Sequence, residues 1–311
     1  MSSGTIIGID GGGTGSRATL ADAGGIPVVE TTGGPLNPYA LSSGAFEYNL
    51  RRLCEDLLQK AGARAERITS VGAGMAGVRT PEERTPVERL LSGIFPNAGR
   101  LRVTHDLGIA LRGATSDGEG VMIVAGTGSA AHGRWRGRET FVGGWGQMLG
   151  DEGSGYEIGI QALRAVVQAE DGRSEGTALR DAILNRLGLQ VPRDLVSWCA
   201  GASKAGIAAL AKIVLTCAGV GDRPSLNILD QGAAEIARMA STAIRRLKAD
   251  GDRVEVALGG GLMTPPAVDP QKTVSYFHLC RARILREAPD LAVIPPRQGA
   301  VQGAVLFAME D

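Results

Sequence analysis

Cysteine is scarce in this sequence, and its acidic and basic residues are balanced. The 311 residues include four cysteines, which lie far apart and form no Cys-X-X-Cys pair. This distribution disfavours a structural zinc site or a disulfide framework and is typical of a reducing cytosol. Lys and Arg together number 33, as do Asp and Glu, so the formal net charge is zero. Binding of nucleic acid by a broad basic surface is therefore disfavoured.

Long apolar stretches are also lacking. The most apolar one, residues 205–221, is rich in Ala and Gly, carries Lys212 and is too short to cross a bilayer. Residues 5–10 form a strand-like segment close to the first residue, without the arrangement of a signal peptide. We therefore expect a cytoplasmic protein that binds neither a membrane nor nucleic acid.

Glycine, in contrast, is abundant. The sequence has 46 glycines, roughly twice the usual share of about 7%. They show no Gly-X-Y period and gather instead in short clusters, at residues 11–15, 126–128, 143–146, 153–155 and 259–261. This clustering predicts that the backbone comes close to a ligand at several places.

Two segments share the same predicted order of strand, glycine-rich turn and strand. The first has strands at 5–10 and 17–22, and the second, about 115 residues later, has strands at 121–125 and 129–134. Strands and helices alternate between them, which predicts an α/β fold of two related domains with a cleft between them. We place the first domain at residues 1–116, with the final helix at 299–311 able to join it. The second and larger domain, with helical insertions, then spans residues 117–298.

Helices are predicted from the spacing of apolar residues and from capping signals. Thr80, Pro81 and Glu83 form a capping box with proline in the first turn, so a helix should begin there. The apolar periodicity predicts further helices at residues 42–60, 155–169, 175–187, 203–218 and 223–248.

The glycine-rich turns suit phosphate groups. Successive backbone N–H groups can converge on an anion where no Cβ obstructs them, and the hydroxyls of Thr14 and Thr127 can add donors. The motif Gly-X4-Gly-Lys-Ser/Thr is absent, and a strand rather than a helix follows the first turn, which disfavours a dinucleotide fingerprint. For any single turn, a tight hairpin without a ligand is the alternative.

Several other residues each allow two interpretations. Asp10 ends the first strand, where it would hold a divalent cation beside a phosphate or simply begin a turn. Asp106 lies at a strand-to-helix junction, where it would be a general base or a helix N-cap. Asp151 would bind sugar hydroxyls, or else Asp151 or Ser154 would cap a helix. Trp145 would stack on a sugar or fill the core.

Taken in order, these motifs resemble those of the N-acetylglucosamine kinases. These enzymes belong with the BadF/BadG/BcrA/BcrD-type activator ATPases in the superfamily of sugar kinases, Hsp70 and actin. The resemblance rests on residues 8–14, Asp106 and residues 125–129, 143–155 and 258–261. Because the ending at 299–308 fits as well, it covers nearly the whole chain. The segment at 143–155, with its Gly-Gly-Trp-Gly and Asp-Glu-Gly-Ser-Gly runs, is the most specific part.

The resemblance implies two ribonuclease-H-like domains, of the actin/hexokinase type, that close over ATP, Mg²⁺ and an amino sugar. The implied reaction is ATP-dependent phosphorylation of the 6-hydroxyl, with Asp106 as its base and Asp10 holding Mg²⁺ through water. Homodimers are common among the relatives, although the sequence identifies no interface. The implied ATP-binding residues are Gly11, Gly12, Gly13, Thr14, Gly126, Thr127, Gly128, Gly259, Gly260 and Gly261. The implied sugar-binding residues are Asn37, Asp106, Ser129, Gly143, Gly144, Trp145 and Asp151.

One departure from the pattern leaves the choice of sugar open. Relatives that prefer the N-acetyl sugar often have Asn after the Gly-Thr-Gly-Ser run, whereas this chain has Ala130. N-acetylglucosamine is the first expectation, with glucosamine or N-acetylmuramic acid as alternatives. Two other functions stay open: a non-catalytic sugar sensor, and an activator ATPase that carries an iron–sulfur cluster for a dehydratase or reductase.

Overall fold

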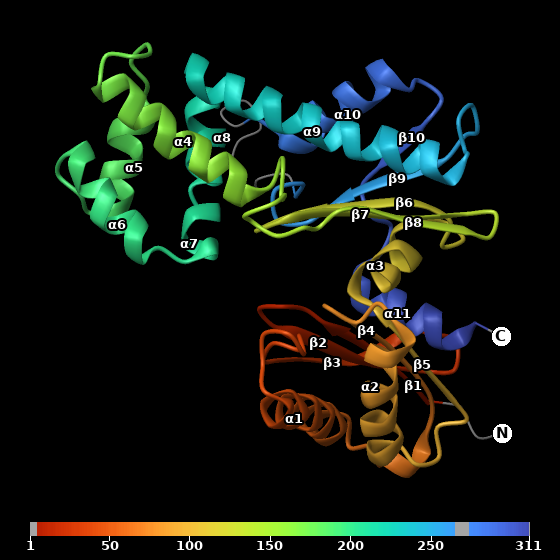
Figure 1. The fold of residues 1–311 in the computed structure, drawn as a ribbon. Coiled ribbons are helices and arrows are strands. Elements are labelled where there is room, and N and C mark those ends of the chain that lie inside the picture. Colours follow the sequence, from red (N-terminus) through yellow and green to blue (C-terminus); the bar gives the residue numbers. More distant parts are fainter. Residues whose placement is uncertain (1–4, 265–273, 311) are drawn as a thin grey trace. The chain divides into compact units, whose positions relative to one another are not determined.

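The computed structural model describes residues 5–264 and 274–310, and the chain divides into two compact units (Figure 1). Unit 1 contains residues up to 119 and those from 296 onward, so the last helix of the chain belongs to it. Unit 2 contains residues 120–295. Each unit is built around one five-stranded sheet.

In unit 1, the sheet has the strand order β3-β2-β1-β4-β5. β1, β2 and β3 are successive antiparallel strands, and β4 and β5 run parallel to β1. The five strands are β1 (Thr5–Gly11), β2 (Ser16–Ala21), β3 (Pro27–Gly33), β4 (Ile68–Met75) and β5 (Arg100–His105).

Four helices cover the two faces of this sheet (Figure 1): α1 (Ser43–Ala61), α2 (Pro81–Ile94), α3 (Asp106–Ala114) and α11 (Ala300–Met309). Side chains alternate between the two faces of a strand. On one face, Ile7 and Ile9 pack in a cluster with the buried residues of α1 and α2. On the other face, Ile6 packs with Val305 of α11. A 3₁₀ turn at Ala65–Arg67 precedes β4.

The predicted start of α2 is confirmed. The Thr80 hydroxyl accepts a hydrogen bond from the Glu83 amide, and the Glu83 carboxylate accepts one from the Thr80 amide. Pro81 is the first helical residue. This signal is local, which explains why the sequence alone locates it.

The sheet of unit 2 repeats the arrangement of the first one. Its order is β10-β9-β6-β7-β8, in which β6 takes the place of β1. β6, β7 and β8 are antiparallel, whereas β9 and β10 are parallel to β6. The predicted α/β fold with an internal repeat is thus confirmed. The strands are β6 (Gly120–Ala125), β7 (Ser129–Trp135), β8 (Arg138–Gly143), β9 (Glu255–Gly259) and β10 (Ala292–Ile294).

The described helices of unit 2 number seven, together with a 3₁₀ turn at Pro192–Asp194. The longest of them, α9, packs on β6, β7 and β8 and buries twelve residues, all but Ser225 non-polar, against them and its neighbouring helices. The helices are α4 (Gly155–Glu170), α5 (Leu179–Leu187), α6 (Leu195–Gly201), α7 (Lys204–Ala208), α8 (Ala211–Gly219), α9 (Arg223–Leu247) and α10 (Tyr276–Glu287). Within residues 5–264 and 274–310, no helix has the length and apolar character that a bilayer span requires.

Two helix predictions are wrong in detail. The single helix predicted at 203–218 is two helices, α7 and α8, because α7 ends where its last residues pack against α4 at Gly155 and Gly159. The helix predicted at 175–187 begins at Leu179, because the Asp222 carboxylate accepts hydrogen bonds from the Thr177 hydroxyl and the next amide. Strand β8 and helix α6 were not predicted at all.

Candidate active site

The two acidic residues predicted for catalysis lie at one edge of the sheet in unit 1. β1, β4 and β5 are parallel and in register, with Asp10 beside Gly74 and Met75 beside His105. Their carboxyl ends therefore meet, which is where ligands bind in sheets of this kind. Asp106 follows β5 directly as the first residue of α3.

Asp106 is not the N-cap of α3, so this interpretation is wrong. The cap is His105, whose Nδ1 accepts a hydrogen bond from the Gly108 amide at 2.8 Å. Asp106 Oδ1 accepts a hydrogen bond from the next amide, of Leu107, at 2.9 Å. His105 thus takes over the capping role and leaves Asp106 in an orientation fixed by the helix start.

Asp10 carries an unfavourable charge. Its burial, and secondarily the negative charge of Asp106, raise its pKa from 3.8 to about 6, although Arg17 opposes this shift. Two carboxylates that repel each other form an attractive site for a divalent cation.

The first glycine-rich turn lies beside these carboxylates. The Gly12 amide donates to the Gly15 carbonyl at 3.0 Å and closes the turn between β1 and β2. Asn37 lies against this turn, because a Cβ placed on Gly13 would be 3.9 Å from its Nδ2. The structure therefore brings Asn37, 23 positions beyond Thr14 in the sequence, to the predicted phosphate-binding turn.

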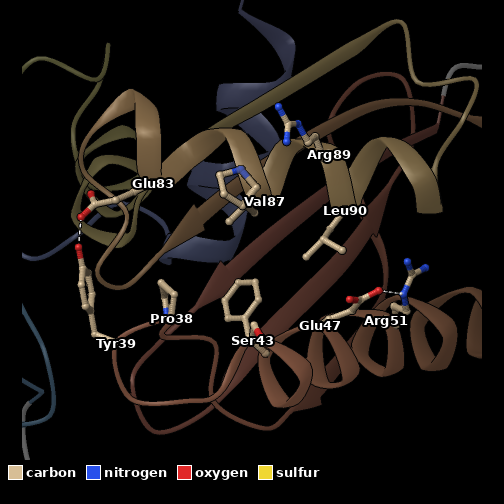
Figure 2. Close-up of a pocket in the computed structure, with 11 residues that line it drawn as sticks. Pro38, Tyr39, Ser43, Glu47, Arg51, Glu83, Val87, Arg89 and Leu90 are labelled. Carbon is tan, nitrogen blue, oxygen red and sulfur yellow. Dashed lines mark hydrogen bonds and ion pairs between the residues drawn. The ribbon is translucent and has the colours of Figure 1, made fainter.

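The orientation of Asn37 is set by its own loop. Asn37 Oδ1 accepts a hydrogen bond from the Tyr39 amide at 2.9 Å. The Tyr39 hydroxyl in turn donates to the Glu83 carboxylate, and this bond is the first cause that lowers the pKa of Glu83 to about 2. Figure 2 shows this pair at one end of a cavity of about 620 Å³ between α1 and α2. None of the predicted site residues lines the cavity, but its wall anchors the loop that carries Asn37.

In unit 2, the second glycine-rich turn is held by Asp151. The Gly126 amide donates to the Gly128 carbonyl at 2.9 Å, which closes the turn as in unit 1. Asp151 Oδ1 accepts a hydrogen bond from the Ser129 amide at 3.1 Å. A Cβ on Gly128 would lie 2.6 Å from this oxygen, so only glycine leaves room for the carboxylate. Asp151 is therefore part of the framework of the turn.

The loop at 151–155 has further hydrogen bonds to its surroundings. The Ser129 hydroxyl donates to the Glu152 carbonyl at 2.7 Å, and the Gly155 amide donates to the Gly126 carbonyl at 2.8 Å. Ser154, rather than Asp151, is the N-cap of α4, since its hydroxyl accepts from the Glu157 amide. Of the predicted sugar-binding residues, Asp151 belongs to this loop and Ser129 is hydrogen-bonded to it, and both are buried.

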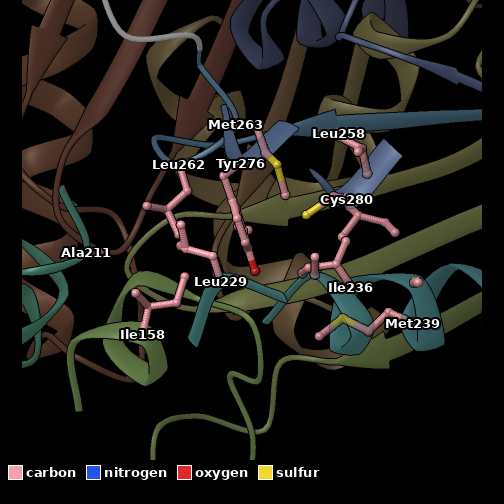
Figure 3. Close-up of a cluster of buried hydrophobic side chains, with 14 of the residues drawn as sticks. Ile158, Ala211, Leu229, Ile236, Met239, Leu258, Leu262, Met263, Tyr276 and Cys280 are labelled. Carbon is pink, nitrogen blue, oxygen red and sulfur yellow. The ribbon is translucent and has the colours of Figure 1, made fainter. Parts of the chain in front are cut away.

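Tyr276 anchors the loop at 151–155. Its side chain lies in the hydrophobic cluster of unit 2 with Leu229 and Ile236 (Figure 3). Its hydroxyl donates to the Gly153 carbonyl at 2.9 Å. Burial raises its pKa well above 10.0, so the hydroxyl stays protonated and remains a donor.

We expect Tyr276→Phe to lower the free energy of unfolding by about 1–2 kcal/mol, because the buried Gly153 carbonyl loses its partner. Urea denaturation measures this change as a shift in the midpoint of unfolding, while the dependence of the free energy of unfolding on urea concentration stays the same. Tyr48→Phe, at an exposed position on α1, is the control and should change the midpoint little. Equal effects of the two substitutions would contradict the anchoring role.

Gly143 is the last residue of β8, and Gly144 and Trp145 follow it. The Gly144 amide donates to the Ser129 carbonyl at 3.0 Å, which ties this segment to the second turn. Trp145 is 72% exposed, so the interpretation that it fills the core is wrong. Met148 and Leu149, three and four residues further on, are also exposed. This concentration of exposed apolar side chains is typical of a binding surface.

The third glycine cluster lies beside the second. β9 is parallel to β6, and the Leu262 amide after the cluster donates to the Ala125 carbonyl at 3.2 Å. Gly260 has a φ of +100° and packs against Ala125, a conformation and a contact that need glycine. Residues 126–128 and 259–261 therefore form one glycine-lined edge of the second sheet.

The predicted residues thus form one group in each unit. Unit 1 brings together Asp10, the first turn, Asn37 and Asp106, and unit 2 brings together all the others. Sequence reasoning gave His105 a structural or solvated role without identifying it as the cap. It missed Tyr276 and Lys204, and Nζ of Lys204 lies 2.6 Å from Asp151 Oδ2. Nothing in the sequence near Lys204 marks this role, because its partner is 53 positions away.

Comparisons with known proteins identify the family of this chain. The model of the BadF/BadG/BcrA/BcrD ATPase family matches residues 7–308. The chain is 29% identical to an N-acetylmuramic acid/N-acetylglucosamine kinase of Clostridium acetobutylicum, over 98% of both chains. It is 30% identical to an N-acetyl-D-glucosamine kinase of Dictyostelium discoideum, over 100% of this chain and 99% of the other.

A solved structure extends this similarity to the fold. The crystal structure of a candidate N-acetylglucosamine kinase from Chromobacterium violaceum superimposes with a TM-score of 0.76 at 27% identity, over 99% of this chain and 100% of the other. The predicted resemblance is confirmed, and the chain belongs to the BadF/BadG/BcrA/BcrD ATPase family.

Proposed function

We propose that this protein transfers the γ-phosphoryl group of ATP to the 6-hydroxyl of an amino sugar. The observation that carries the proposal is the pair Asp10 and Asp106 beside the first glycine-rich turn, at the carboxyl ends of parallel strands. The names of the similar proteins support the choice of an amino sugar as acceptor.

Asp106 is the proposed general base. It takes the proton of the sugar hydroxyl as the oxygen attacks the γ-phosphorus, while the bond between that phosphorus and the β,γ-bridging oxygen breaks to release ADP. Phosphoryl transfer requires chiefly positioning and charge stabilisation, so one well-placed carboxylate is sufficient. The capping by His105 supports this role, because Asp106 does not have to cap α3.

The turns at 11–14 and 126–128 are the proposed phosphate-binding elements, and residues 259–261 lie near the adenosine. The proposed donors are the backbone amides other than those of Gly12 and Gly126, which close the turns, and the glycines present no Cβ to an anion. The carboxylate of Asp10 fits Mg²⁺, because this ion is usually held by one or two carboxylates, water and substrate phosphates. Bound Mg²⁺ neutralises phosphate charge.

The sugar is proposed to contact Asn37, Ser129, Gly143, Gly144, Trp145 and Asp151. Exposed Trp145 offers an apolar ring face, as in many carbohydrate sites. Ser129 and Asp151 already bond within the protein. A sugar hydroxyl can therefore donate only to lone pairs of their oxygens that these hydrogen bonds do not use. A carboxylate accepts about four hydrogen bonds, so such lone pairs remain.

The preferred sugar is best tested with a panel of acceptors. We expect ADP release, coupled to pyruvate kinase and lactate dehydrogenase, to be fastest with N-acetylglucosamine and slower with glucosamine, N-acetylmuramic acid and glucose. The product should carry its phosphate on the 6-oxygen by phosphorus and proton NMR. Release of ADP without stoichiometric sugar phosphate, with every acceptor, would contradict the proposal.

The activator-ATPase alternative requires cysteine thiolates as cluster ligands. Three of the four cysteines are buried. Burial raises the pKa of the Cys54 and Cys280 thiols to about 12, which disfavours their thiolate forms. The kinase therefore remains the better supported function.

A further inference from the structure

Asp151 forms a buried ion pair that none of the motifs predicts. It is 3% exposed, and its φ of +65° lies in the left-handed region, which is unusual for aspartate. Its Oδ2 lies 2.6 Å from Nζ of Lys204, while its Oδ1 holds the Ser129 amide. Lys204 keeps about a third of its side chain exposed, at 34%. The lysine thus reaches the buried carboxylate from the surface.

Lys204 is placed by helix packing. It is the first residue of α7, which is N-capped by the Ser203 hydroxyl. α7 packs on the first turns of α4, where a Cβ on Gly155 would lie 2.9 Å from the Gly126 carbonyl oxygen and 3.1 Å from that of Ala208. The start of a helix favours acidic rather than basic residues. Helix stability therefore does not explain a lysine at this position, whereas its ion pair with Asp151 does.

We propose that Lys204 is a positioning residue of the phosphoryl-transfer site: its ammonium holds the Asp151 carboxylate in place as the acceptor for the Ser129 amide and so fixes the turn at 126–129. The inference rests on the proposed function for the role of that turn. A buried carboxylate that loses its only cation is strongly destabilised. Without Lys204, the Asp151 carboxylate would turn toward solvent, and the Ser129 amide would lose its acceptor.

The first test needs no ligand. Lys204→Met keeps the length of the side chain and removes its charge, and Lys212→Met is the matched control at an exposed position on α8. Hydrogen exchange, followed by mass spectrometry or NMR, should be at least about tenfold faster for residues 126–130 in Lys204→Met and unchanged in the control. Unchanged exchange in this segment of Lys204→Met would overturn the proposal.

The second test measures nucleotide binding well below the melting temperature. We expect the Kd of a non-hydrolysable ATP analogue, by calorimetry, to rise at least about tenfold in Lys204→Met and to be largely restored in Lys204→Arg. A purely structural lysine would lower the melting temperature without changing this Kd, and that result would refute the positioning role. A wild-type protein that binds no nucleotide would refute the proposed function, while hydrogen exchange would still decide the role of Lys204.

A double variant covers the case in which Lys204→Met does not fold. Asp151→Asn combined with Lys204→Met removes both charges, and the Asn Oδ1 can still accept from the Ser129 amide. Replacing both members of a buried ion pair is tolerated far better than removing one. We expect protection of residues 126–130 close to that of the wild type. Rapid exchange there in the folded double variant would contradict the proposal.

Discussion

Asp106→Asn is expected to lower kcat about a thousandfold, because a general base contributes roughly 10²–10⁴-fold to such a reaction. The substitution preserves shape, and the Asn Oδ1 can still accept from the Leu107 amide, so the start of α3 should be intact. ATP binding should therefore change little. The coupled assay and calorimetry measure the two quantities separately.

Asp117→Asn is the matched control for this substitution. Asp117 is an exposed residue of the same unit, and its carboxylate also accepts from a nearby backbone amide, that of Glu119. Its replacement should leave turnover within about twofold of the wild type, as surface changes usually do. An Asp106→Asn protein with nearly normal turnover would show that another group receives the proton.

The second large effect is expected for Asp10→Asn, which should stabilise the protein while abolishing activity. The pKa of Asp10 is about 6 in the folded protein and 3.8 without its environment. The ionised form is therefore disfavoured by folding, by about 2–3 kcal/mol. This cost is fully present above pH 6, decreases as the pH falls from about 6 to 4, and is absent below that range.

Urea denaturation at two pH values tests this sign. Asp10→Asn should be more stable than the wild type by about 2 kcal/mol at pH 8, and the difference should disappear near pH 4. Its activity should be lost at both values, because the proposed ligand of Mg²⁺ is gone. A variant less stable than the wild type at pH 8 would show that the charge of Asp10 is compensated in the folded state.

Local signals in the sequence account for most of what could be predicted. The capping box before α2, the glycine-rich turns and the alternation of strands and helices each depend on neighbouring residues, and all were found in the structure. The cap of α3 shows the limit of this reasoning. Aspartate is the better N-cap by preference, but in the structure the chain enters the helix one residue earlier, at His105.

Contacts between distant segments account for most of what was missed. Lys204 reaches Asp151, and Tyr276 reaches Gly153, across separations that no periodicity records. The break between α7 and α8 depends on packing against α4, because an Ala-rich stretch favours helix throughout. Sequence reasoning thus located the glycine-rich turns, while the residues that hold them in place became visible only in three dimensions.

The place of α11 has a consequence for biosynthesis. It packs on the face of the first sheet that carries Ile6, yet it leaves the ribosome after all of residues 120–295. At about 5–20 residues per second, that face stays uncovered for on the order of ten seconds or more of translation. The later-made unit can therefore complete its core before the last helix closes the earlier one.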